Sequence, residues 1–182
     1  PTSAQIGYPL SVCRDTSGGI YVFSDTDNQF RRVVVGVVVT SQVAPLSAQV
    51  MGHNILVANA NVGIIAHCRV KTNSELLLLD SKYNVLWNVD EFNKNDAFGD
   101  TRYIRSIVGY VPGISLPVTA APLRSIQTVW VDTSDYVYCL ELPRGVAHRI
   151  EANSGMVSYY AGTGILGYNG DSKQATTASM NT

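Results

Sequence analysis

Three groups of residues in this sequence have types and spacings that could support chemistry. Residues 25–28 (Asp-Thr-Asp-Asn) have an acidic spacing suggestive of calcium, but the Gly and the distal Glu of an EF-hand are not in place. Residues 167–171 are glycine-rich but lack the Lys-Ser/Thr of a phosphate-binding loop. His53, His67 and His148 form no HxH or HExxH pattern, and no GxSxG segment is present. We therefore interpret residues 25–28 as a turn and residues 167–171 as a tight linker, and we expect no catalytic residue, no metal site and no cofactor.

The three cysteines give no sign of a zinc cluster. Cys13, Cys68 and Cys139 are far apart in the chain and form no CxxC pair. An odd number cannot pair fully within one chain. The preferred interpretation is three small buried hydrophobic side chains, with their redox state left open.

The composition is that of a folded domain. The chain has 182 residues, of which 46% are hydrophobic and 15% charged, with a net charge of −1. This charge gives no reason to expect a nucleic-acid partner, and the strongest apolar run, residues 33–39, is too short for a membrane helix. The sequence has no initiating Met and no signal peptide, so we expect a piece of a larger protein.

Short β-rich segments separated by Gly, Asn, Asp and Ser run through the chain, and helical periodicity is almost absent. Residues 33–39, 75–79 and 136–139 are examples of such segments. Many short strands with polar turns indicate an all-β propeller, barrel or sandwich.

An internal repeat favours the propeller. Val12 and the residues after it fall on Val129 and its successors without a gap for more than thirty positions, a shift of 117. The turn residues Asp15-Thr-Ser and Asp132-Thr-Ser coincide in this superposition. Residues 1–6 also resemble residues 175–180, which gives a unit of about 58 residues. A four-stranded sheet of that size buries both faces when sheets stack around an axis.

The first unit resembles the NHL repeat, whose form is P-x-G-V-A-V-D-x-x-G-N-hydrophobic-Y-V-A-D followed by N-x-hydrophobic-R. Residues 8–22, 24–28 and 30–33 carry this resemblance. Residues 160–171 resemble the AGTG…GYSGDGG segment that links adjacent NHL blades. The likeness is weak over residues 46–124, where Asn73-Ser74 stand in place of the Asp turn and residues 90–100 form a polar insertion.

The resemblance implies a β-propeller of four-stranded antiparallel blades, present here in part. We expect blades over residues 1–46, 47–117 and 118–174, with 175–182 opening another. Since NHL propellers close with five or six blades, further blades of the same protein or another subunit would complete the ring, so self-assembly is one expectation. Arg32 and Arg149 occupy equivalent positions, and we expect each to pair with a strand-end Asp.

The function expected from these features is a non-enzymatic structural or protein-interaction scaffold in a secreted or cell-surface protein. A cytoplasmic location stays open. The alternatives are a lyase-like or lactonase-like propeller enzyme with a metal in the central channel, and a ligand- or sugar-sensing domain. The partner is expected to be a protein rather than nucleic acid or a membrane, and the candidate contact residues are Asn93, Asn95, Phe98, Tyr110 and Tyr168.

Overall fold

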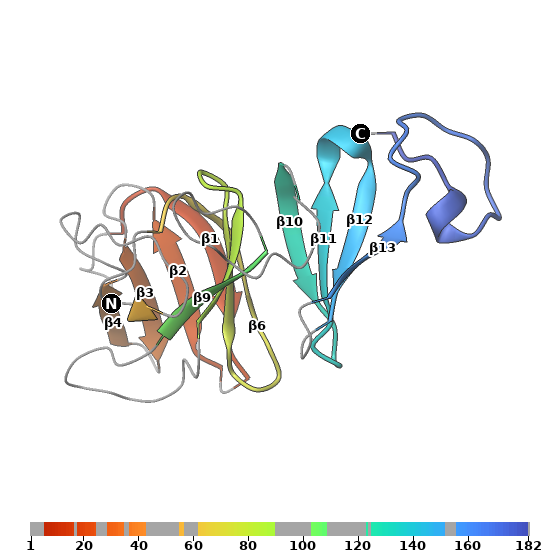
Figure 1. Cartoon of the computed structure of the whole chain (residues 1–182). Helices are drawn as coiled ribbons and strands as arrows, with labels where there is room; N and C mark the ends of the chain where they lie inside the picture. The colour runs from red at the N-terminus through yellow and green to blue at the C-terminus, as the bar shows by residue number, and fades with distance from the viewer. Residues whose placement is uncertain are drawn as a thin grey trace.

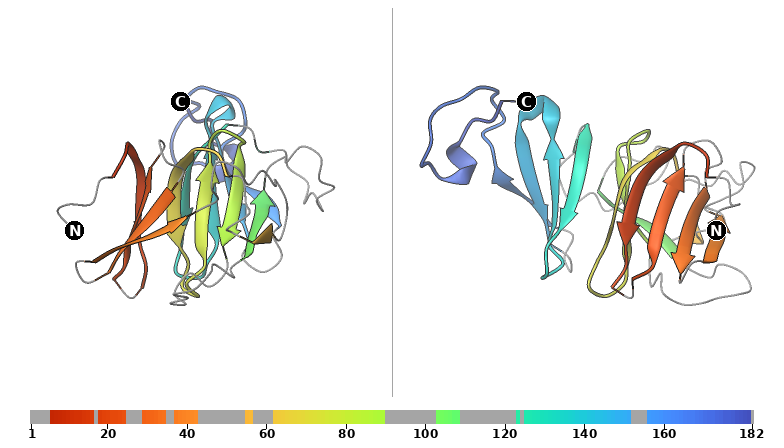
Figure 2. Two further views of the ribbon diagram at one scale, coloured as in Figure 1. Left: turned by 90° about the vertical axis from the view of Figure 1, so that its left-hand side faces the viewer. Right: turned by 180° about the vertical axis from the view of Figure 1, so that it is seen from behind.

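The computed structural model describes most of the β-rich segments of the chain. The described residues are 6–16, 18–24, 29–34, 37–42, 55–56, 62–89, 103–108, 123, 125–151 and 156–181. They form three antiparallel sheets (Figures 1 and 2), and their only helical elements are two short 3-10 turns. The expected all-β propeller with four-stranded antiparallel blades is confirmed. The predicted blade limits stay a prediction because several of the connecting segments lie outside the described residues.

The first sheet has its strands in chain order. It comprises β1 (Pro9–Arg14), β2 (Ile20–Ser24), β3 (Gln29–Val34) and β4 (Val37–Gln42). Each strand pairs with the next, as expected for a meander whose neighbours are joined by short turns.

The middle sheet has a fifth strand at its outer edge. Its order is β5-β9-β8-β7-β6, so the strand that precedes the sheet in sequence pairs with its last strand. Its members are β5 (Ile55–Leu56), β6 (Ile65–Val70), β7 (Leu76–Asp80), β8 (Val85–Val89) and β9 (Tyr103–Val108).

The third sheet again follows chain order, with β10 (Ile126–Val131), β11 (Val137–Glu141), β12 (Val146–Ile150) and β13 (Val157–Ala161). The 3-10 turn η2 (Leu142–Arg144) joins β11 to β12. The second one, η3 (Ala175–Thr177), belongs to the segment after β13.

The strands β1, β6 and β10 bring the three sheets together. Strand β6 contacts both β1 and β10, whereas β4 and β13 lie at the opposite edges of their sheets (Figures 1 and 2). All three have a register irregularity at the same place, which marks them as equivalent strands. It lies between Pro9 and Ser11, between Ile65 and His67, and between Ile126 and Thr128.

The turns after these strands are equivalent too. Gly18, Ser74 and Asp135 all have positive φ, of 91°, 67° and 61°. Each donates its backbone N–H to the carbonyl three residues earlier, at 3.0 to 3.2 Å. Only Gly adopts this conformation without steric cost, so the two non-glycine residues indicate that the turn is strongly imposed by its context.

Two apolar layers lie between the sheets. The first holds Tyr21 and Phe23 from the first sheet and Leu76, Leu78 and Trp87 from the middle sheet. The second layer comes from the other side of the middle sheet and from the third sheet, and it includes Leu77, Leu79, Leu86, Val129, Cys139 and Ile150. Because both of its faces are covered, β7 is buried at every residue, which explains its run of four leucines.

Polar contacts tie the middle sheet to the third one. Asn84 donates from Nδ2 to the carbonyl of Leu123 at 2.5 Å and accepts from the Ile126 N–H at 2.9 Å. Thr72 donates its backbone N–H to Oδ1 of Asp135 at 2.8 Å and its hydroxyl to Oδ2. These contacts set the third sheet against the middle one at both ends of their shared layer.

Candidate functional site

The contact residues predicted from sequence are only partly described. Asn93, Asn95, Phe98 and Tyr110 lie outside the described residues. Tyr168 is described and is 74% exposed. Their grouping into one contact loop therefore stays a prediction.

Backbone and amide contacts close the segment that holds Tyr168 on itself. Gly162 donates its N–H to the carbonyl of Ala175 at 2.9 Å. Asn169 donates from Nδ2 to the Thr177 carbonyl and accepts from the Ser179 N–H, both at 2.9 Å. These bonds fold residues 162–181 back on themselves, and the role of residues 167–171 as a tight linker stays a prediction.

The histidines do not converge. His53 and residues 25–28 lie outside the described residues. His67 lies on β6, where partial burial, with the nearby Arg69, lowers its pKa. Within the residues that the structure describes, His, Cys, Asp and Glu side chains form no group of three or more that could hold a metal ion.

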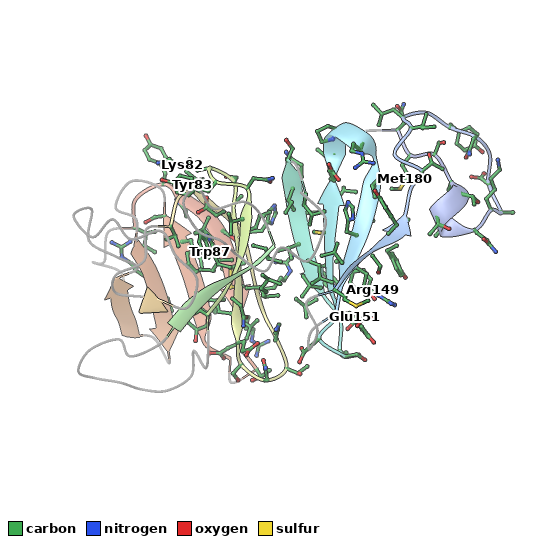
Figure 3. All side chains as sticks on the ribbon, viewed as in Figure 1. Lys82, Tyr83, Trp87, Arg149, Glu151 and Met180 are labelled. Carbon is green, nitrogen blue, oxygen red and sulfur yellow. A yellow bond between two sulfur atoms is a disulfide. The ribbon has the colours of Figure 1, made fainter. Side chains whose placement is uncertain are left out.

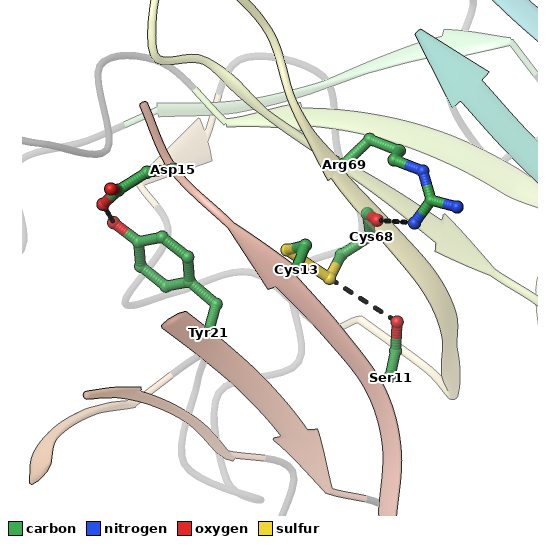
Figure 4. The surroundings of a disulfide bond; sticks show 6 residues. All are labelled: Ser11, Cys13, Asp15, Tyr21, Cys68 and Arg69. Atoms are coloured by element: carbon green, nitrogen blue, oxygen red, sulfur yellow. Dashed lines mark hydrogen bonds between the residues drawn. A yellow bond between two sulfur atoms is a disulfide. The ribbon is translucent and has the colours of Figure 1, made fainter. Parts of the chain in front are cut away.

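Two equivalent Asp–Tyr pairs close the hairpins of the first and third sheets. The Tyr21 hydroxyl donates to Asp15 Oδ2 at 3.0 Å (Figure 4). Asp15 Oδ1 accepts from the Gly19 N–H. The Tyr138 hydroxyl donates to Asp132 Oδ2 at the same distance. Burial and this carboxylate raise the pKa of Tyr138. The aspartates of the repeat therefore hold a turn.

The middle hairpin replaces this pair with an ion pair. Lys71 occupies the position of the two aspartates, because its N–H donates to Glu75 just as Asp15 donates to Gly19. Lys71 Nζ lies 2.7 Å from Glu75 Oε2, and Asn73 Oδ1 accepts from the Glu75 N–H. Asn73 and Ser74 therefore lie in the turn that replaces the Asp turn, and the position of the Asp itself is taken by Lys71.

A second polar pair recurs in every sheet with a spacing of seven residues. In each sheet it joins the last residue of one strand (β2, β7 or β11) to a residue of the next strand along the chain (β3, β8 or β12). Arg31 donates to Ser24 at 3.4 Å, Trp87 Nε1 donates to Asp80 at 3.2 Å, and His148 Nε2 lies 3.0 Å from Glu141 Oε2. The sequence analysis missed these pairs, although their constant spacing was visible in it.

The Asp80 carboxylate accepts four hydrogen bonds. It is fully buried and accepts from the N–H groups of Gly63, Lys82 and Tyr83 at 2.6, 3.1 and 3.0 Å, besides Trp87. Burial raises the pKa of Asp80, and the four donors act against that rise. The carboxyl links the loop before β6 to the β7–β8 turn.

Glu141 and His148 form the most deeply buried acid–base pair of the third sheet. Oε1 of Glu141 has no hydrogen-bond partner, and Arg144 lies 3.9 Å from Oε2. The His148 ring packs against Tyr159, with ring centroids 5.2 Å apart. The layer between the middle and third sheets therefore contains an incompletely paired carboxylate.

The expectation for Arg149 was wrong, because it does not pair with a strand-end Asp. Its guanidinium lies 4.8 Å from the centre of the Tyr136 ring and 3.9 Å from Glu151 (Figure 3). Glu141, the acidic residue at the end of β11, instead contacts His148, which precedes Arg149 in the sequence. The side chain of Arg32 lies outside the described residues.

The cysteine interpretation needs correction for two of the three. Cys13 of β1 and Cys68 of β6 form a disulfide that joins the first and middle sheets, with their Cα atoms 5.7 Å apart (Figure 4). The Ser11 hydroxyl lies 3.5 Å from Cys68 Sγ. Cys139 is free and buried, and burial raises its pKa to about 12, which leaves it an unreactive thiol.

One face of the third sheet carries a group of aromatic and basic side chains, and none of the sheets that the structure describes packs on it. We call it the open aromatic face, and its members are Trp130, Tyr136, Tyr138, Arg149 and Tyr160. The rings of Tyr138 and Tyr160 meet edge to face at 4.9 Å. Trp130 is 61% exposed, although Arg69 of the middle sheet lies 5.0 Å from its ring. Exposed aromatic and arginine side chains of this kind are typical of interaction surfaces.

Comparisons with known proteins identify the fold alone. No family model and no curated protein matches the sequence. A solved protein of unknown function from Bacteroides thetaiotaomicron is 14% identical with a TM-score of 0.63, covering 96% of this chain and 40% of its own. An auxiliary nutrient binding protein from the same organism is 14% identical with a TM-score of 0.60, covering 94% and 40%. A streptogramin B lyase is 10% identical with a TM-score of 0.52, covering 87% and 42%. The chain spans about two fifths of these structures, and its sheets have the β-propeller fold.

Proposed function

We propose that this chain is a non-enzymatic scaffold, an NHL-type propeller segment of a larger protein that is secreted or displayed at the cell surface. The observation that carries this proposal is the use of the buried polar side chains. Asp15 with Tyr21 and Asp132 with Tyr138 close hairpins, and the seven-residue pairs join strands within each sheet. Residues that could do acid–base chemistry are thus engaged in repeated structural contacts.

The inter-sheet disulfide supports the proposed location. A bond between Cys13 and Cys68 forms and persists in oxidising compartments, whereas cytosolic thiols are kept reduced. Both sulfur atoms lie among buried residues, where they hold two sheets together. The described part of the chain contains no helix with the length and apolar character of a membrane span.

The rival function is a propeller enzyme with a metal on the axis. It would require ligands from equivalent positions of several of the first strands. His67 lies at such a position on β6, but the equivalent residues are Ser11 on β1 and Thr128 on β10. Hydroxyl side chains are poor substitutes for the His, Asp or Glu ligands of catalytic metal sites. This difference favours the scaffold.

Metal titration separates the two functions. The purified chain is titrated with Mg²⁺, Mn²⁺ and Zn²⁺ in a calorimeter, and its Tm is followed with each ion. A scaffold is expected to show no saturable heat and an unchanged Tm. Stoichiometric binding that disappears in His67→Ala, but not in the matched variant His148→Gln, would contradict the proposal and favour the enzyme.

A further inference from the structure

The segment that follows β13 is closed by the side chain of one asparagine. Asn169 donates from Nδ2 to the Thr177 carbonyl and accepts at Oδ1 from the Ser179 N–H, both at 2.9 Å. A side-chain amide can make both contacts because it carries a donor and an acceptor on the same carbon. The two bonds join residues of one segment, so they need no contribution from another sheet.

This closure places the end of the segment against the third sheet. A Cβ added to Gly145 or to Gly162 would meet Met180 at 2.7 or 2.8 Å, so Met180 lies close to the start of β12 and the end of β13 (Figure 3). The Ser179 hydroxyl also lies 3.1 Å from Thr163 Oγ1. The bond from Ser179 to Asn169 therefore helps to hold Met180 on the third sheet.

Asn169 also stands in a sequence that favours spontaneous deamidation. It precedes Gly170, and this is the single Asn-Gly pair of the chain. Glycine has no Cβ to shield its backbone nitrogen, and Gly170 has a φ of 102°, which glycine adopts without steric cost. In this reaction the Gly170 nitrogen loses its proton and attacks Cγ of Asn169, and Nδ2 leaves as ammonia. Water then opens the five-membered imide to Asp or to isoaspartate.

The products of this reaction do not fit the closed segment. Deamidation exchanges the Nδ2 donor for a carboxylate oxygen, which would face the Thr177 carbonyl oxygen at the place of the former hydrogen bond. Two acceptors repel each other at that distance, and the carbonyl loses its donor. Isoaspartate also lengthens the backbone by one methylene carbon. Because the released ammonia is lost to the solvent, the change runs in one direction.

We propose that Asn169 is a modification site, at which deamidation irreversibly opens the segment 162–181. In the closed segment both polar atoms of the amide are bonded, which restricts the rotation that brings Cγ to the Gly170 nitrogen. Opening lets the amide react, and the reaction then prevents closing. Each bond made only in the closed form should slow the reaction about fivefold, so the folded chain should deamidate about 30-fold more slowly than a free peptide of residues 165–173.

Mass spectrometry of the ageing protein tests the protection. The full chain and the free peptide are kept in mildly alkaline buffer, and conversion of Asn169 is followed by peptide mapping. Ser179→Pro removes the N–H donor and suits the extended backbone of Ala178, so deamidation should be about fivefold faster. The matched control Ser179→Ala removes the hydroxyl alone and should deamidate at the wild-type rate. A chain that reacts as fast as the peptide, or equal rates in the two variants, would overturn the proposal.

Hydrogen exchange measures the opening itself. Asn169→Asp reproduces one product, and amide exchange over residues 175–181 is expected to be about fivefold faster than in the wild type. Asn73→Asp is the matched control, because it makes the same charge change in a turn where a carboxylate can still accept from the Glu75 N–H. This control should leave exchange over residues 175–181 unchanged. If Asn169→Asp also exchanges like the wild type there, deamidation opens nothing and the proposal is overturned.

Discussion

Asp80 gives the sharpest test of how the polar side chains hold these sheets. In Asp80→Asn, Oδ1 can still accept from the N–H groups of Lys82 and Tyr83. The new amide NH2 would instead face two donors, the Gly63 N–H and the Trp87 indole. The Gly63 N–H and the Trp87 indole N–H are then left without an acceptor in a fully buried place, at about 1 to 3 kcal/mol each. We expect the free energy of unfolding to fall by about 2 to 6 kcal/mol.

Trp87→Phe is the matched control. It removes one of the four donors to Asp80 and keeps an aromatic ring in the core, so about 1.5 to 3 kcal/mol is expected. Urea unfolding followed by circular dichroism measures both variants and the double variant. A loss below about 1 kcal/mol for Asp80→Asn would refute the reasoning, because it would mean that the carboxylate is not needed to satisfy its donors.

The pH dependence of stability follows from the same carboxyl. Burial raises the pKa of Asp80 in the folded protein, so the folded state binds more protons than the unfolded state just above the ordinary carboxyl pKa. The contribution of Asp80 to stability is therefore full at pH below its unfolded pKa and is lost as pH rises through its folded pKa. Asp80→Asn is expected to remove this part of the pH profile, and an identical profile in the wild type and the variant would contradict the assignment.

Three further predictions concern other contacts. Reducing the Cys13–Cys68 bond opens a loop of 55 residues and should lower stability by about 4 kcal/mol in denaturant titrations, whereas Cys139→Ser should leave the response to reductant unchanged. His148→Ala leaves the Glu141 carboxylate buried and without its partner, so a loss of about 3 to 5 kcal/mol is expected, with partial recovery in His148→Ala/Glu141→Leu; no recovery would show that the pair is not the cause. Gly162→Ala places a Cβ against the Gly145 carbonyl at a φ of 92°, so the Tm should drop, while Gly167→Ala, with free space around it, should cost less.

The first and third repeats could be predicted from the sequence because the same residue types form the turn in both. The shift of 117 residues aligns Asp15 with Asp132 and Tyr21 with Tyr138, and the structure gives both pairs the same hydrogen bond. The middle hairpin was harder, since Lys71 and Glu75 replace that pair by an ion pair with no shared residue type. An alignment of the repeats predicts the position of a contact only where the same residue types form that contact in each repeat.

The candidate site was less predictable for a different reason. A disulfide between Cys13 and Cys68 depends on two sheets meeting, which spacing along the chain does not reveal. The same holds for Trp130 and Tyr138, whose residue types fit a core as well as an exposed face. Whether these two side chains are exposed depends on whether another sheet packs against them, so only the folded structure shows it.

The pairing of β5 with β9 has a mechanical consequence for the middle sheet. Ile55 lies opposite Ile104 and Leu56 opposite Tyr103, so the strand that enters this sheet is bonded directly to the strand that leaves it. Tension applied through the two flanking segments would load β5 and β9 from the same end, because the strands are antiparallel. Such loading breaks hydrogen bonds one after another rather than all at once. Under stretching, β5 would peel away at low force, while β6, β7 and β8 remained folded.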